Sequence, residues 1–211
     1  MIPLLVVPTL TRHDLLVRML ESVDDAVGQL IVIDNSGRGV ELPDGPWERW
    51  DVLPMPANLG VAASWNLAVK MGHRLPWVMV CSDDVVWPEG ALGRFAEASS
   101  EDRLVLSETW PHWCAFTIGM GVVEKVGLFD EGYYPAYFED NDYERRCQSA
   151  GVTLGRGPAL QHDNSSTLHT PGTDFAAVNK RSFHKNQELF NSGQHGGFSP
   201  FRWRRQSWLD A

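Results

Sequence analysis

The fold of this chain is decided by the stretch Trp77-Val-Met-Val-Cys-Ser-Asp-Asp-Val-Val-Trp87. Its first five residues are apolar and the next three are polar, a pattern that predicts a short buried strand over 77–81. In open α/β sheets, ligands bind beyond the carboxyl ends of the strands, so Asp83 and Asp84 indicate a binding site. The alternative is that these two residues cap the turn into a helix that begins at Pro88.

A divalent metal is one ligand that two such carboxylates can hold. Magnesium and manganese prefer oxygen ligands, and they usually share their coordination sphere with the phosphates of a substrate. The stretch therefore raises the hypothesis of metal-assisted chemistry on a phosphate-containing substrate.

The composition of the chain sets wider limits. Its 211 residues are 43% hydrophobic and 21% charged, which suits one domain, with or without an extension. The net charge of −9 argues against a protein that coats nucleic acid. Cys81, Cys114 and Cys147 show no CxxC spacing, which favours free thiols in a reducing compartment. There is no basic leader and no apolar run of membrane-spanning length, so we expect a cytoplasmic protein without a transmembrane segment.

Strand and helix patterns alternate along the chain, which predicts an α/β fold with a mostly parallel sheet. The first helix is expected to have Thr11 as its N-cap, Asp14 in its first turn and apolar positions up to Val27. A short edge strand is expected over 51–55, after a loop over 38–49. The other expected strands cover 2–7, 30–33, 104–106, 114–118 and 152–154, and the other helices cover 61–71, 89–98, 122–126, 139–150 and 173–190.

The C-terminal part of the chain has its own pattern. The buried face of the helix over 173–190 is expected to carry Phe175, Val178, Phe183 and Leu189. The tail over 201–208 is basic and aromatic within an acidic chain. It is either an arm packed on the domain or a contact for an acceptor, a partner or a membrane surface.

Short motifs follow the predicted strands in a fixed order. They are Pro8-Thr9-Leu10, Asp34-Asn35-Ser36, Asn58-Leu-Gly60 with Asn66, Ser82-Asp83-Asp84, Gly127-Leu-Phe-Asp130-Glu131, Tyr137-Phe138-Glu139-Asp140-Asn-Asp142 with Arg145, and His162 before Ser165 and Ser166. In this order they resemble the GT-A fold glycosyltransferases, specifically the family 2 group that uses nucleotide-activated sugars. The resemblance spans about residues 3–168.

The resemblance implies a GT-A, Rossmann-like domain over 1–170, followed by a C-terminal helix and tail over 171–211. It also implies an inverting enzyme that moves a sugar from a nucleoside-diphosphate sugar to an acceptor hydroxyl. UDP-sugars are the favoured donors, with GDP- and dTDP-sugars as alternatives. The acceptor hydroxyl belongs to a glycan, a protein, a small molecule or a modified nucleic-acid base. A degenerate nucleotide-sugar binding module and a nucleotidyltransferase are the competing functions, and the oligomeric state is left open.

Roles in donor binding follow from the same resemblance. Asp34 is expected to bond the base or ribose, or else to form an Asx-turn with Ser36 or Gly37. Asn66 is expected either at the donor or as a structural hydrogen-bonder between its helix and a loop. The full set implied for the donor is Pro8, Thr9, Leu10, Arg12, Asp34, Asn35, Asn58, Gly60, Asn66, Ser82 and Asp83.

The resemblance assigns the metal, Mn²⁺ or Mg²⁺, to Asp84 and His162, with diphosphate oxygens and water as the remaining ligands. Ser82 stands where the family's Asp-x-Asp pattern has its first acid, and Asp83 is expected at the ribose. The alternative for His162 is a polar surface residue in a loop.

The catalytic base is placed in the Phe-Glu-Asp-x-Asp motif, with Asp140 the first choice and Glu139 the second. The alternative is that both acids merely compensate a helix dipole. Asp142 is expected to cap the helix or to bind Arg145. Aromatic side chains are implied as a platform for the acceptor, or alternatively as core residues: Trp110, Trp113, Tyr134 and Tyr137.

Overall fold

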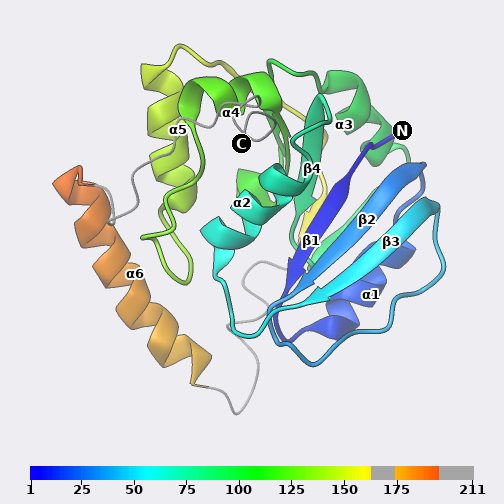
Figure 1. The fold of residues 1–211 in the computed structure, drawn as a ribbon, viewed down its shortest axis with the longest axis horizontal. Coiled ribbons are helices and arrows are strands. Elements are labelled where there is room, and N and C mark those ends of the chain that lie inside the picture. The colour runs from blue at the N-terminus through cyan, green and yellow to red at the C-terminus, as the bar shows by residue number, and fades with distance from the viewer. Residues whose placement is uncertain (163–173, 195–211) are drawn as a thin grey trace, which may run out of the picture.

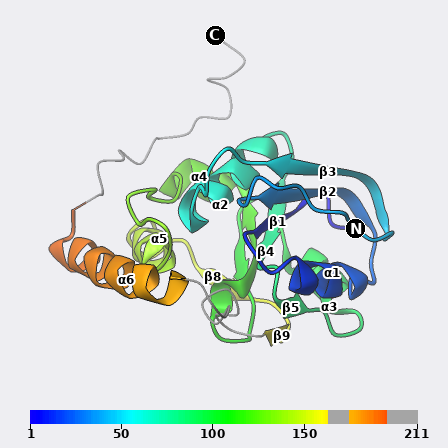
Figure 2. The ribbon, with the colours of Figure 1, turned by 90° about the horizontal axis from the view of Figure 1, so that it is seen from below.

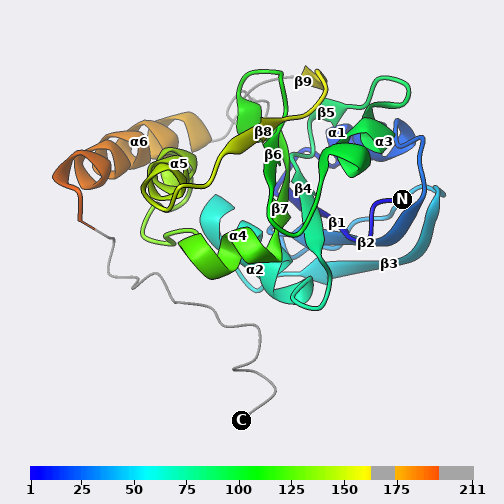
Figure 3. The same cartoon turned by 90° about the horizontal axis from the view of Figure 1, so that it is seen from above.

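The computed structural model describes residues 1–162 and 174–194, and these form a sheet with helices on both faces. Figures 1, 2 and 3 show the sheet in the middle of the molecule, with α1 and α3 on one face and α2 and α4 on the other. Ser165 and Ser166 of the His162 motif and the tail over 201–208 lie outside the described residues.

The main sheet has seven strands in the order β3-β2-β1-β4-β7-β6-β8. Neighbouring strands from β3 to β4 run parallel, β7 is antiparallel to β4 and β6, and β6 pairs with β8 in parallel. The strands are β1 (Leu5–Thr9), β2 (Val27–Asp34), β3 (Trp47–Pro54), β4 (Trp77–Cys81), β6 (Leu104–Leu106), β7 (Ala115–Gly119) and β8 (Leu154–Arg156), and a separate pair joins β5 (Val85–Val86) to β9 (Gln161–His162). This architecture confirms the predicted mixed, mostly parallel α/β sheet.

The helices cover both faces of the sheet and create two cores. Strands covered on both faces read as continuous apolar runs, which is why 77–81 could be recognised as a strand. The helices are α1 (His13–Glu21), α2 (Val61–Met71), α3 (Ala91–Ala98), α4 (Met120–Val126), α5 (Glu139–Ser149) and α6 (Phe175–Ser192), with a 3₁₀ turn at His112–Cys114. One core packs against α2, α4 and α5, and the other packs against α1 and α3.

Two predictions in the N-terminal half were wrong. The residue before α1 is Arg12 rather than Thr11, and no side chain caps that helix. Val27 begins β2 instead of extending α1. The strand expected over 51–55 is the edge strand, as predicted, but it has eight residues and begins at Trp47. Its apolar signal is weak because most of its side chains are exposed at the edge of the sheet.

The predicted buried face of α6 is also wrong. Val178 and Phe183 are 40% and 36% exposed, and Leu189 is half-buried. The side chain of Phe175 lies outside those described. Among the described side chains of this helix, the fully buried one is that of Asn186, because α6 lies beside α5 and packs partly through polar contacts (Figures 1 and 2).

Two global expectations can be compared with the structure. Cys81, Cys114 and Cys147 are buried free thiols, as the absence of paired spacing predicted. Within residues 1–162 and 174–194, no helix is both long and apolar enough to cross a membrane. The division of the chain at residue 170 stays a prediction.

Asn66 joins α2 to the loop before α5. Its side chain is fully buried, donates to the Phe129 carbonyl and to Glu131, and accepts from the Phe129 amide. The amide group is thereby used within the fold, as the structural alternative for Asn66 predicted.

Replacing Asn66 by Ala is expected to lower the free energy of unfolding by about 3 kcal/mol, because two buried backbone groups of Phe129 lose their partner. Urea unfolding followed by far-UV circular dichroism measures this change. Gln29→Ala, which removes an exposed side-chain hydrogen bond to Asp51, is the control with an expected change below about 0.5 kcal/mol. A loss as small as the control's for Asn66→Ala would contradict the structural role.

Candidate active site

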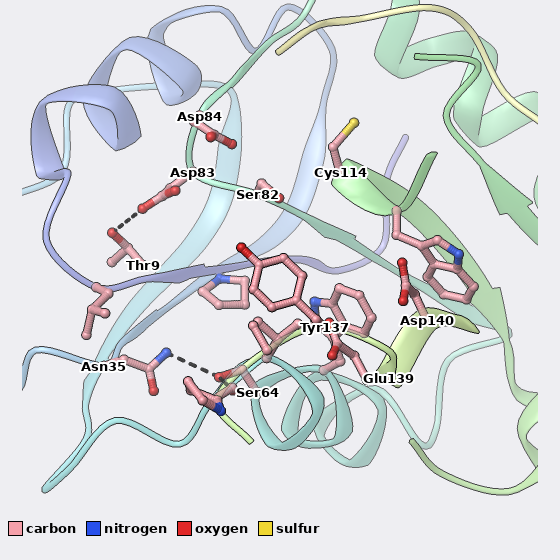
Figure 4. Close-up of a pocket in the computed structure, with 18 of the residues that line it drawn as sticks. Thr9, Asn35, Ser64, Ser82, Asp83, Asp84, Cys114, Tyr137, Glu139 and Asp140 are labelled. Atoms are coloured by element: carbon pink, nitrogen blue, oxygen red, sulfur yellow. Dashed lines mark hydrogen bonds between the residues drawn. The ribbon is translucent and has the colours of Figure 1, made fainter. Parts of the chain in front are cut away.

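A cavity of about 440 Å³ opens at the carboxyl ends of β1 and β4. Its floor comes from the residues that follow these two strands, and Tyr137, Glu139 and Asp140 lie across from them (Figure 4). Val178 and Asn179 at the start of α6 complete the far wall. Most of the residues predicted from the sequence line it: Pro8, Thr9, Leu10, Asn35, Asn58, Gly60, Ser82, Asp83, Asp84, Trp113, Tyr137, Glu139, Asp140 and His162.

Asp83 is held at the floor of the cavity. Thr9 donates its hydroxyl to Asp83 at 2.6 Å, and this bond crosses from β1 to β4 (Figure 4). Burial, with a smaller contribution from neighbouring Asp84, raises the pKa of Asp83 to about 7. The chain continues into β5 rather than into a helix, so the alternative that Asp83 and Asp84 cap a helix is wrong.

The two predicted metal ligands lie together. His162 Nε2 is 3.0 Å from Asp84 Oδ1, and both side chains are more than nine-tenths buried. The contact arises because β9 pairs with β5, which places His162 opposite Val85, next to Asp84. A carboxylate and an imidazole side by side at a cavity wall fit a divalent metal that takes its other ligands from a diphosphate and water. Within the described part of the chain, no cluster of three or more potential ligands occurs.

Glu139 and Asp140 lie across the cavity from Asp83 and Asp84 (Figure 4). Burial raises the pKa of Glu139 well above its ordinary value, with a smaller contribution from Asp140. Within the described residues, Glu139 Oε2 is buried and has no hydrogen-bond partner. Burial also raises the pKa of Asp140, whose Oδ1 accepts a hydrogen bond from the Asn141 amide.

Asp142, two residues further along α5, has a structural role. It is fully buried and accepts hydrogen bonds from Arg145 at 3.1 Å and from Arg146 at 2.7 Å. The expected contact with Arg145 is confirmed, and the closer contact with Arg146 was missed. The motif therefore separates two cavity-facing acids from one that holds the helix in place.

One side of the cavity is shaped by the start of α2. Gly60 has φ of 79°, and a Cβ there would lie 2.9 Å from the Pro135 carbonyl and from the Tyr134 ring, so only glycine fits. Asn35 accepts from the Leu59 amide and donates to Ser64, which fixes the loop before α2. Sequence reasoning missed Ser64 as a cavity residue, although the small residues at 62–64 were the signal that would have found it.

Four residues of the predicted set do not line the cavity: Arg12, Asp34, Asn66 and Trp110. Arg12 pairs with Asp14 on the surface. The Asp34 carboxylate accepts from the amide and hydroxyl of Ser36 and from the Gly39 amide, so its Asx-turn alternative is present. Trp110 is 71% exposed.

Trp113 belongs to the core and to the cavity at once. It is 6% exposed, stacks on Trp65 at 5.6 Å, and donates its indole N–H to Glu144. It also meets Phe116 and Phe129 edge to face. Only part of this ring faces the cavity, so core packing, the alternative to an acceptor platform, accounts for most of its contacts.

Comparison with known proteins supports the resemblance. A galactofuranosyl glycosyltransferase of Leishmania donovani is 31% identical over 100 residues, which is 44% of this chain. The match covers 22% of that protein, so the chain spans about a fifth of this curated relative's length. No family model matches the chain.

Among solved structures, the catalytic domain of Drosophila β1,4-galactosyltransferase 7 in complex with xylobiose has a TM-score of 0.52 at 12% identity, covering 86% of this chain and 80% of that one. A mutant of the same enzyme, in complex with manganese, UDP-Gal and xylobiose, has a TM-score of 0.54 at 11% identity, covering 85% and 78%. These similarities confirm the predicted GT-A fold. Membership of family 2 stays a prediction.

The raised pKa of Glu139 predicts a pH-dependent stability. Above about pH 4.5 the unfolded chain loses the carboxyl proton of Glu139, whereas the folded protein still holds it. Glu139 therefore lowers the free energy of unfolding as the pH rises. Glu139→Gln removes this cost, so its free energy of unfolding is expected to exceed that of the wild type at about pH 8 and to approach it near pH 4. Urea unfolding over this pH range measures the difference.

Glu124→Gln, at an exposed position of α4, is the matched control and should parallel the wild type at every pH. A constant offset between Glu139→Gln and the wild type across the range would show that Glu139 is ionised in the folded protein.

Proposed function

We propose that this chain, which has the GT-A fold, is an inverting glycosyltransferase that moves a sugar from a nucleoside-diphosphate sugar to an acceptor hydroxyl. The observation that carries the proposal is the arrangement of one cavity. The Asp84–His162 pair stands on one wall, and Glu139 and Asp140 stand across from it. A displacement needs a stabilised leaving group on one side of the reacting carbon and a base on the other.

The donor nucleotide binds at the ends of β1 and β4. The carboxylate of Asp83, fixed by Thr9, is placed to accept a ribose hydroxyl. The loop over 58–60 leads into the N-terminus of α2, where backbone amides favour an anion such as the diphosphate. A UDP-sugar is the favoured donor, since the Drosophila relative was solved with UDP-Gal.

Asp84 and His162 would hold a divalent cation, Mn²⁺ or Mg²⁺, which would neutralise charge on the departing diphosphate. The charge of the cavity supports this requirement. Among the described residues that line it, four are acidic and none is Lys or Arg. Such walls repel a bare diphosphate, because unit charges near a protein surface interact by several kcal/mol at about 4 Å. A bound cation reverses the sign of that interaction.

Asp140 is the base that takes the proton of the acceptor hydroxyl. Burial raises its pKa, which makes it a stronger base than an ordinary Asp. Glu139, whose pKa burial raises well above its ordinary value, is the second choice for the base; in its protonated form its O–H can donate a hydrogen bond to substrate. Attack from the side of Asp140 meets the anomeric carbon opposite the leaving group, which inverts its configuration.

The acceptor enters between Tyr137 and α6. Tyr137, Val178 and Asn179 line this end of the cavity and offer an aromatic ring, an apolar side chain and an amide. A sugar presents both apolar C–H faces and hydroxyl groups, so these residues suit a saccharide acceptor. The xylobiose in both complexes of the Drosophila relative supports the same class.

Removal of a metal ligand is expected to weaken donor binding. With Mn²⁺ present, Asp84→Ala and His162→Ala should each raise the dissociation constant of a UDP-sugar more than about 10-fold, since loss of mere second-shell partners costs 10–100-fold in metal sites. Calorimetry with UDP-, GDP- and dTDP-sugars, with Mn²⁺ or with EDTA, measures this. Asp51→Ala, an exposed carboxylate on β3, is the control. Absence of binding by the wild type to every donor would favour a degenerate module.

Removal of the base should stop turnover without affecting the donor. Asp140→Asn is expected to lower kcat at least about 100-fold with an unchanged donor dissociation constant, in line with the usual contribution of a general base. In the wild type, kcat/KM should fall as the pH drops through the pKa of Asp140, which lies above 3.8. Donor hydrolysis, or transfer to xylobiose, measures both. A larger loss in Glu139→Gln than in Asp140→Asn would exchange the two roles.

A further inference from the structure

The loop that delivers Glu139 and Asp140 is held in an unfavourable backbone conformation. Tyr137 and Phe138 have φ values of 77° and 74°, in the left-handed region that residues with a side chain rarely adopt. They directly precede α5, so the direction of the two cavity-facing carboxylates depends on their conformation. Strain of this kind persists only where surrounding groups enforce it.

Asn186 of α6 is one of the groups that enforce it. Its side chain is fully buried, although most of its neighbours on α6 are exposed. The Nδ2 amide donates to the carbonyl of Ala136 at 2.8 Å and lies 3.3 Å from the carbonyl of Tyr137. Both carbonyls flank the start of the strained segment, so the amide fixes the backbone about 50 residues away in sequence.

Asn179 contacts the same loop two helical turns earlier, on the same face of α6. Its Nδ2 donates to the Tyr137 hydroxyl at 3.0 Å, and it lines the cavity together with Tyr137. Asn186 thus holds the backbone of Tyr137, and Asn179 holds its ring.

Aromatic packing closes the contact between α6 and the loop. Phe183 lies 5.4 Å from the Tyr137 ring and 5.1 Å from the Phe138 ring, and Phe190 lies 5.5 Å from Phe138. Arg145 of α5 stacks on Phe190 at 4.5 Å. Figures 1 and 3 show α6 running beside α5, away from the strands that bind the donor.

We propose that α6 is a positioning element of the active site: Asn186 and Asn179 hold residues 136–138 in the conformation that turns Glu139 and Asp140 into the cavity. This inference rests on the proposed function, because it gives these carboxylates their role in transfer. It assigns to the C-terminal helix a part in the catalytic step and none in donor binding.

The test compares full-length variants by two measurements. Asn186→Leu keeps the side-chain size and removes both contacts to the loop, Asn186→Gln keeps an amide donor, and Asn179→Ala releases the Tyr137 ring. Hydrogen–deuterium exchange over residues 133–142 reports the order of the loop. Kinetics and calorimetry report kcat and the dissociation constant of the donor.

Asn186→Leu is expected to speed exchange over 133–142 while leaving 77–86 unchanged. It should lower kcat about 10- to 100-fold, the loss that a displacement of roughly 1 Å produces, and change donor affinity less than about twofold. Asn186→Gln should recover part of the activity. If Asn186→Leu fails to fold, Asn179→Ala should show the same split between kcat and donor affinity.

Two controls separate positioning from general stability. Val123→Ala, which truncates a buried side chain of α4, should lower the melting temperature without a selective increase in hydrogen–deuterium exchange over 133–142. Lys185→Ala, on the exposed side of α6, should match the wild type.

Unchanged exchange over 133–142 in Asn186→Leu, or unchanged kcat despite faster exchange, would overturn the inference. The inference would also be overturned if Asn186→Leu lowered kcat and donor affinity together, and by the same factors as Val123→Ala, when the two variants have equal melting temperatures. Lack of turnover by the wild type with every donor would instead overturn the proposed function, and the exchange data would still decide whether α6 orders the loop.

Discussion

The candidate active site depends on the parallel pairing of β1 with β4. This register sets Leu5 against Met79 and Val6 against Val80, so both strands end at the same rim. Thr9 then meets Asp83 in a 2.6 Å hydrogen bond between residues 74 positions apart. Parallel strands place all their carboxyl ends on one side, and the position of the cavity follows from that rule. Without the pairing, Asp83 and Asp84 would be two surface carboxylates.

The predictability of each element follows its burial. β4 and α2 were predicted at their observed boundaries, because β4 is covered on both faces and α2 follows a glycine that ends the preceding loop. β3 was predicted too short because an edge strand carries charged side chains within a weak apolar pattern. The face of α6 was mispredicted because the side chain that is fully buried among those described is an amide, and hydrophobic periodicity cannot find a buried polar contact.

The sequence predicted those site residues that belong to a motif directly after a strand. It did not predict which polar side chains are bonded within the fold instead of facing the cavity. Asp84 and His162 were placed together correctly, although they lie far apart in the sequence. Asp34 and Asn66 are also polar, but Asp34 is bonded by Ser36 and Gly39 of its own loop, and Asn66 by Phe129 and Glu131 of a distant loop. A polar residue that bonds other parts of the fold and one that faces a cavity occur at the same positions, after a strand or near the start of a helix. The sequence pattern alone therefore does not tell them apart.

Two explanations can be compared for the acids at the start of α5: stabilisation of the helix N-terminus, and a role in the cavity. A helix N-terminus stabilises an ionised carboxylate by about 0.3–1 kcal/mol, whereas burying a charge costs several kcal/mol. At Glu139 and Asp140 the burial effect is larger, since both pKa values are raised rather than lowered. Helix-dipole compensation therefore does not explain these residues. Two carboxyls that face a cavity at such a cost, directly after a strained segment, are the arrangement expected of a site that binds substrate or transfers a proton, which is the role proposed for them.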